Sequence, residues 1–119
     1  MTGPELARVA VERHGEAVLA RLAGEIDLSN ATAVEDQVTS GLDGATAVAV
    51  DLAGLSYLDS AGLALLARLA GRLADLAGAL RLVVPRDAVV SRTVSISGLS
   101  AAIPVDETVE AALAALDRT

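Results

Sequence analysis

Residues 48–66 read VAVDLAGLSYLDSAGLALL and contain the change of pattern that decides the fold. The residues up to Leu52 form a short, nearly continuous apolar run, as expected of a strand covered on both faces. From Ser60 onward, leucines recur at helical spacing until about Leu76, and Gly78 ends the pattern. We therefore predict a buried strand over residues 46–52 that leads into a helix over residues 60–76.

The flanking residues continue the same alternation of elements. Residues 7–13 and 17–26 are predicted as strands, with His14 and Gly15 as the hairpin turn between them. Residues 29–42 are predicted as a helix that Asp27 or Ser29 can cap. Further strands are expected over residues 79–84 and 102–105, and a last helix over residues 106–116 with Asp106 as its cap. Residues 87–97 are ambiguous, because their serines and β-branched residues weaken a helix prediction.

This order of elements predicts one α/β domain. Strands alternate with helices after the first hairpin, which implies a mixed, mainly parallel β-sheet with covering α-helices. No linker or repeat divides the 119 residues, and residues 1–4 are expected to be a short N-terminal tail.

Composition narrows the classes of function. The formal net charge is −7, which makes nucleic acid and anionic membranes poor partners. The chain has no cysteine, so thiolate metal sites and disulfides are excluded, as suits a cytoplasmic protein. No signal peptide is visible, and charged residues within 68–75 interrupt the most apolar stretch. The one histidine, His14, has no obvious partner, so we expect no catalytic set, no metal site and no cofactor.

The predicted helix from Ser60 has two distinct faces. On a helical wheel, the side that must face the core carries Gly62, Leu66, Leu69, Leu73 and Leu76. A second line of small, exposed residues, here called the small-residue stripe, consists of Ser60, Ala64, Ala67 and Gly71. This stripe would let another protein backbone approach closely, although the abundance of alanine could also produce it by chance.

Two readings apply to Asp59 and Ser60. Either residue is a good N-cap for the helix. The same position also suits a phosphate on Ser60, because free N–H groups and the positive end of the helix dipole lie there. A phosphoserine would add roughly −1.5 to −2 units of charge.

Three segments carry a resemblance to a known family. Residues 48–66, residues 22–31 (LAGEIDLSNA) and residues 97–113 (SGLSAAIPVDETVEAAL) resemble the STAS domain of bacterial anti-sigma factor antagonists and sulphate transporters. The resemblance covers nearly the whole chain. It departs at Ala61, where many relatives have a second hydroxyl residue, and at residues 89–97, where a leucine-rich helix is usual.

The resemblance implies a phosphorylation switch. A partner that is both anti-sigma factor and serine kinase would bind the unphosphorylated chain, release its sigma factor and phosphorylate Ser60. A metal-dependent serine phosphatase would restore binding. Asp59 and Asp27 match acidic residues beside the phosphorylation site, although Asp27 could equally be only a helix cap. The expected partner-binding residues are Asp27, Asp59, Ser60, Ala61, Gly62, Ala64, Ala67 and Gly71.

Other roles within this family remain open. STAS domains also serve as non-switching scaffold subunits of stress-sensing or lipid-transport complexes, in which Ser60 would be only a cap. A cytoplasmic domain of a transporter would need a membrane portion that this sequence lacks.

Overall fold

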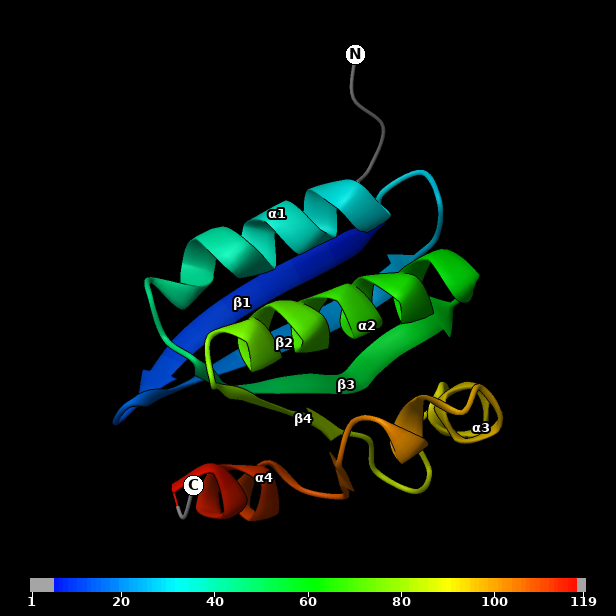
Figure 1. Cartoon of the computed structure of the whole chain (residues 1–119). Helices are drawn as coiled ribbons and strands as arrows, with labels where there is room; N and C mark the ends of the chain where they lie inside the picture. Colours follow the sequence, from blue (N-terminus) through cyan, green and yellow to red (C-terminus); the bar gives the residue numbers. More distant parts are fainter. Residues whose placement is uncertain (1–5, 118–119) are drawn as a thin grey trace.

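The computed structural model describes residues 6–117 and shows a five-stranded sheet in the order β1-β2-β3-β4-β5. Strand β1 pairs with β2 in the antiparallel direction, and the pairs β2–β3, β3–β4 and β4–β5 are parallel. The elements follow the order β1 (Ala7–His14), β2 (Ala17–Ile26), α1 (Ala31–Leu42), β3 (Ala47–Leu58), α2 (Ser60–Asp75), β4 (Ala79–Val83), α3 (Ser91–Ile96), a 3-10 turn (Leu99–Ala101), β5 (Val105–Asp106) and α4 (Val109–Asp117). The predicted mixed, mainly parallel sheet is confirmed (Figure 1). The expected tail at residues 1–4 lies outside the described residues.

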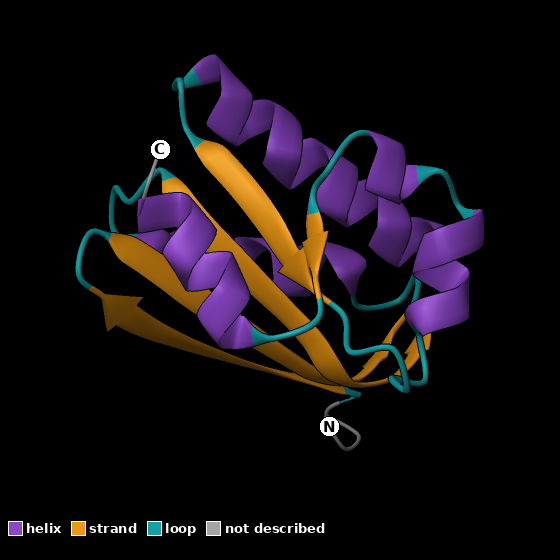
Figure 2. Ribbon diagram, turned by 90° about the horizontal axis from the view of Figure 1, so that it is seen from below, coloured by secondary structure: helices purple, strands orange, loops and turns teal. Residues whose placement is uncertain are grey.

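Helices cover both faces of the sheet. Helices α1 and α2 lie side by side over one face, and α4 lies on the other (Figures 1 and 2). Alternate residues of β3 serve the two layers: Val48 and Val50 belong to the larger core, and Ala49 packs under α4. All three are fully buried, which explains the nearly continuous apolar run in this strand.

The first hairpin turns one residue later than predicted. His14 pairs with Ala17, so the turn consists of Gly15 and Glu16. Gly15 has a φ of +63°, which glycine adopts without steric cost. His14 is the last residue of β1, and its Nε2 lies 3.0 Å from an oxygen of Glu12.

Strand β3 runs six residues beyond its predicted end, to Leu58. Its pairing with β2 shifts register twice, and after the second shift Ile26 pairs with Leu58. Between the shifts lies Gly24, with a φ of +93°, where an added Cβ would come 2.1 Å from the carbonyl oxygen of Leu6. The irregularity therefore requires glycine, and it aligns the carboxyl ends of the two strands.

Helix α2 buries the face that its periodicity predicted, with two differences. Gly62, Leu66, Leu69 and Leu73 are buried, and Leu65 joins them. Leu76 is 64% exposed, because the helix ends at Asp75 and the chain turns through a left-handed residue at Ala77.

The C-terminal part departs most from the expectations. Only Ser91–Ile96 of the ambiguous stretch is helical, and Val94 is its buried residue. Asp106 does not cap α4, because its carboxylate accepts hydrogen bonds from Arg81 at 2.7 and 3.2 Å. The cap is Thr108, whose Oγ1 accepts from the N–H of Ala111. None of the helices within residues 6–117 has the length and apolar character needed to cross a membrane.

Candidate functional site

The hydrogen bonds at the start of α2 show that Asp59, and not Ser60, is the N-cap of this helix. Asp59 has extended backbone angles, and its Oδ1 accepts from the N–H groups of Ala61 at 2.9 Å and Gly62 at 3.4 Å. Ser60 is the first residue of the helix, and its side chain is exposed. Within residues 6–117 its hydroxyl makes no hydrogen bond. Modification of this oxygen would therefore disrupt no internal contact.

The loop after β2 lies beside this helix start. The N–H of Asp59 donates to the carbonyl of Ile26 at 3.4 Å, which joins the ends of β3 and β2. Asp27 directly follows Ile26 and Asp59 directly follows Leu58, so both residues lie just beyond adjacent strands at the same end of the sheet. The two acidic residues that the sequence indicated are thus brought to one end of the molecule, the end where ligands of open α/β sheets are usually found.

Asp27 is held by its own loop and does not cap α1. Its Oδ1 accepts from the N–H of Ser29 at 2.8 Å and from the Ser29 hydroxyl at 2.5 Å. These hydrogen bonds, the hydroxyl one first, lower the pKa of Asp27 below its usual value, so the side chain is an anion at neutral pH. Neither the Asp27 nor the Ser29 side chain makes a capping bond to α1, contrary to one of the two readings of Asp27.

Asn30, which is not among the predicted site residues, stabilises this loop through its side chain. Its Oδ1 accepts from the N–H of Asp27 at 2.9 Å, and its Nδ2 donates to the carbonyl of Glu25 at 2.8 Å. Asn30 lies inside the helix predicted over residues 29–42, whereas α1 begins only at Ala31, so the predicted boundary concealed its place in the loop. The loop is therefore ordered by side-chain hydrogen bonds.

The small-residue stripe is exposed along its whole length. Ser60, Ala64, Ala67 and Gly71 all lie on the surface, and a Cβ added at Gly71 would meet nothing within 4 Å. Ala61 is half-buried and packs against the core. The prediction of a smooth surface on α2 is confirmed by this exposure.

Gly62 does not belong to that surface. It is buried, and a Cβ there would lie 2.2 Å from Leu58 Cδ1 and 3.2 Å from Ile26 Cγ2. We correct its assignment: Gly62 cannot touch a partner directly, and instead it allows the helix start to sit closely on the two strand ends.

The arginines beside the stripe are engaged with α1. Arg68 donates twice to Oε1 of the buried Glu35, at 3.0 and 2.7 Å, and these bonds raise the pKa of Arg68. Arg72 lies 3.7 Å from the other oxygen of Glu35. The two helices that flank the site are thereby joined by side-chain ion pairs as well as by apolar packing.

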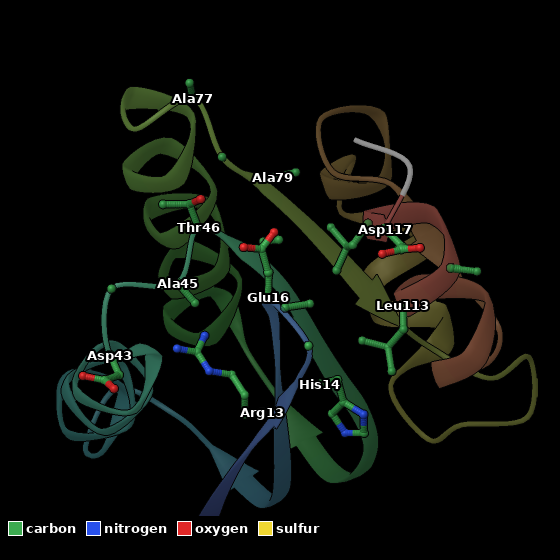
Figure 3. Close-up of a pocket in the computed structure, with 17 residues that line it drawn as sticks. Arg13, His14, Glu16, Asp43, Ala45, Thr46, Ala77, Ala79, Leu113 and Asp117 are labelled. Atoms are coloured by element: carbon green, nitrogen blue, oxygen red, sulfur yellow. The ribbon is translucent and has the colours of Figure 1, made fainter.

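A cavity of about 860 Å³ lies at the opposite end of the sheet, where the parallel strands begin. The hairpin, the starts of β3 and β4, and α4 enclose it, and its polar lining includes Arg13, His14, Glu16, Asp43 and Asp117 (Figure 3). His14 bonds to Glu12 rather than to another lining residue. Within residues 6–117 no group of three acidic or histidine side chains is placed to hold a metal ion. The cavity lies where β3 and β4 begin, whereas Ser60 lies just beyond the end of β3. The cavity is therefore separate from the site at Ser60.

Comparisons with known proteins agree with this geometry. A model of the STAS domain matches residues 8–112. The chain is 33% identical over 111 residues to the anti-sigma-F factor antagonist RsfA of Mycobacterium tuberculosis. This match covers 91% of the present chain and 86% of RsfA.

Solved structures show the same fold. An anti-sigma factor antagonist from Mycobacterium paratuberculosis superposes with a TM-score of 0.84 at 28% identity, over 98% of this chain and 99% of the other. SpoIIAA, an anti-sigma factor antagonist, superposes in its unphosphorylated form with a TM-score of 0.74 at 25% identity, over 94% and 98% of the two chains. The phosphorylated form of SpoIIAA from Bacillus superposes with a TM-score of 0.66 at 26% identity, over 93% of this chain and 98% of the other.

Proposed function

Because the chain belongs to the STAS-domain family, we propose that it is an anti-sigma factor antagonist controlled by phosphorylation of Ser60. The unphosphorylated chain binds a serine-kinase anti-sigma factor, which then releases its sigma factor. The modified chain no longer binds, and a metal-dependent serine phosphatase restores it. In this proposal the chain is a kinase substrate and a binding protein in the cytoplasm, and it performs no catalysis itself.

One observation carries this proposal: an exposed serine with a free hydroxyl stands at the start of α2, directly after an acidic cap. A kinase can reach this oxygen without unfolding the helix. Similarity to SpoIIAA, which has been solved in both unphosphorylated and phosphorylated forms, supports control by phosphorylation.

The proposed binding surface extends from the acidic loop along α2. It comprises Asp27, Asp59, Ser60, the exposed part of Ala61, and the rest of the small-residue stripe. Small side chains allow close packing of a partner's backbone, so a bulky charged group at the stripe's first residue would oppose that packing by volume and by charge. The anionic Asp27 and Asp59 favour a partner surface that carries basic residues.

The proposal is tested by incubating the chain with its cognate serine-kinase anti-sigma factor and ATP, and by measuring the intact mass. We expect one phosphate on the wild type and none on Ser60→Ala. Ser56→Ala is the matched control, because Ser56 is also exposed but donates its hydroxyl to the Gly24 carbonyl at 3.2 Å. Equal labelling of wild type and Ser60→Ala would overturn the assignment of Ser60. Stable binding of the kinase without any phosphorylation would instead support a non-switching scaffold role.

A further inference from the structure

Strand β1 is an edge strand, and no other strand within residues 6–117 pairs with its outer side. It has eight residues and no proline, so its backbone groups are available to another strand. Natural proteins commonly protect such an edge with lysine or other charged side chains, with proline or with a bulge, and β1 has no lysine, proline or bulge. The charges on β1 have both signs.

The hydrogen-bond pattern shows which groups point outward. The N–H of Glu25 donates to the carbonyl of Leu6 at 2.8 Å, and the pairing of β1 with β2 is regular from Ala7 to His14. Backbone groups alternate in direction along a strand, so the even-numbered residues face β2 and residues 7, 9, 11 and 13 face outward.

We propose that two copies of this chain pair through β1, antiparallel and related by a two-fold axis at Ala10. In this register Val9 of each copy forms a hydrogen-bonded pair with Val11 of the other, and Ala7 pairs with Arg13. The two sheets become continuous, with up to about eight main-chain hydrogen bonds between the strands. The interface uses the same patch on both copies, as a two-fold dimer requires.

Charge complementarity selects this register. On the face away from α1, Arg8 of each copy comes opposite Glu12 of the other, and opposite charges in such cross-strand positions attract. Arg8 is exposed and makes no ion pair within residues 6–117. Glu12 is also exposed, and it is held in place by Arg21 at 3.2 Å and by His14 at 3.0 Å. Moving the axis by one residue still pairs outward-facing groups, but it places Arg8 opposite Ala10 or His14 of the other copy, so the attraction to Glu12 is lost.

The other face offers an apolar strip for the same partner. Val9 and Val11 are only half-buried under α1, and they line an open groove of about 510 Å³ with Asp36, Gln37 and Ser40. The valines of a second copy, which lie opposite these two in the proposed register, would extend the apolar strip along this groove. Helix α1 lies between this edge and α2 (Figure 1), so the pairing leaves Ser60 accessible and does not depend on the proposed function.

Sedimentation velocity on the full chain over a wide concentration range tests the proposal. We expect the mass to rise from 12.0 kDa towards twice that value. The register is tested with Ala10→Cys, since the chain has no cysteine and Ala10 lies on the proposed axis. The two Cα atoms of such a pair are about 4.5 Å apart, within disulfide range. Ala74→Cys, exposed on α2, is the control.

Charge reversal gives an independent test. Arg8→Glu should weaken dimerisation roughly tenfold, because two attractive cross-strand pairs become repulsive. Glu12→Arg should do the same, and mixing the two variants should restore dimers, since both pairs are then opposite in charge. Circular dichroism first confirms that each variant is folded. If Glu12→Arg does not fold, the separate results for Arg8→Glu and for Ala10→Cys still test the proposal. A monomer at every concentration, or a dimer in which Ala10→Cys cross-links no faster than Ala74→Cys, would overturn the proposal.

Discussion

Replacing Asp59 by alanine should destabilise the protein through one identifiable loss. The Asp59 carboxylate accepts the N–H groups of Ala61 and Gly62, and the substitution leaves both without that partner. Removal of an N-cap side chain typically costs about 1 kcal/mol, within a range of 0.5–2 kcal/mol. For a chain of 119 residues this corresponds to a fall in Tm of roughly 3–6 °C per kcal/mol.

The adjacent serine provides the contrast. The Ser60 hydroxyl makes no hydrogen bond within residues 6–117 and its side chain is exposed, so Ser60→Ala should leave Tm nearly unchanged. Asp59→Asn is the matched control, because asparagine caps about as well as aspartate without the charge. It should retain most of the stability that Asp59→Ala loses.

Thermal unfolding followed by circular dichroism, with urea unfolding at constant temperature as a second measure, checks the three variants. A loss of stability in Ser60→Ala equal to that in Asp59→Ala would refute the assignment of the cap. Ser60 would then have a structural role, and its availability to a kinase would be in doubt.

Three further predictions concern binding and acidity. Ser60→Asp should weaken binding of the anti-sigma factor in calorimetry relative to Ser60→Asn, and equal affinities would show that charge there does not control the complex. Ala64→Arg should reduce that affinity without lowering Tm, because Ala64 is exposed; undiminished affinity would reject the stripe as the interface. Ser29→Ala should raise the pKa of Asp27 towards 3.8 in an NMR titration, since Ser29 provides its strongest hydrogen bonds. Because the folded pKa is the lower one, these bonds stabilise the fold above pH 3.8, and that contribution is lost as the pH falls through the folded pKa.

The periodic parts of the sequence predicted the fold well because burial alone determines them. The leucines of α2 and the apolar run of β3 face the core as their spacing requires, and the exposure of Ala64 and Ala67 follows from the same periodicity. Leu76 fails the pattern only because the helix ends one residue before it.

Contacts between distant segments explain the predictions that failed. Asp106 is a reasonable cap by its position, but Arg81 on the neighbouring strand binds its carboxylate. Asp27 likewise follows a strand and precedes a helix, yet it forms hydrogen bonds with Ser29 and Asn30 within the loop and does not cap the helix through its side chain. The family motif places Gly62 on the partner surface, whereas the helical wheel places it on the core side, where it is buried.

The capping bonds of Asp59 also determine where the charge of a modified Ser60 would be felt. The amides of Ala61 and Gly62 that could have balanced a phosphate already face an internal counter-ion. A phosphate one residue later therefore meets a helix end that is largely neutralised, and its field extends outward into the space where a partner would sit. Asp59 would in this way increase a partner's sensitivity to the modification, in addition to its own contact with that partner.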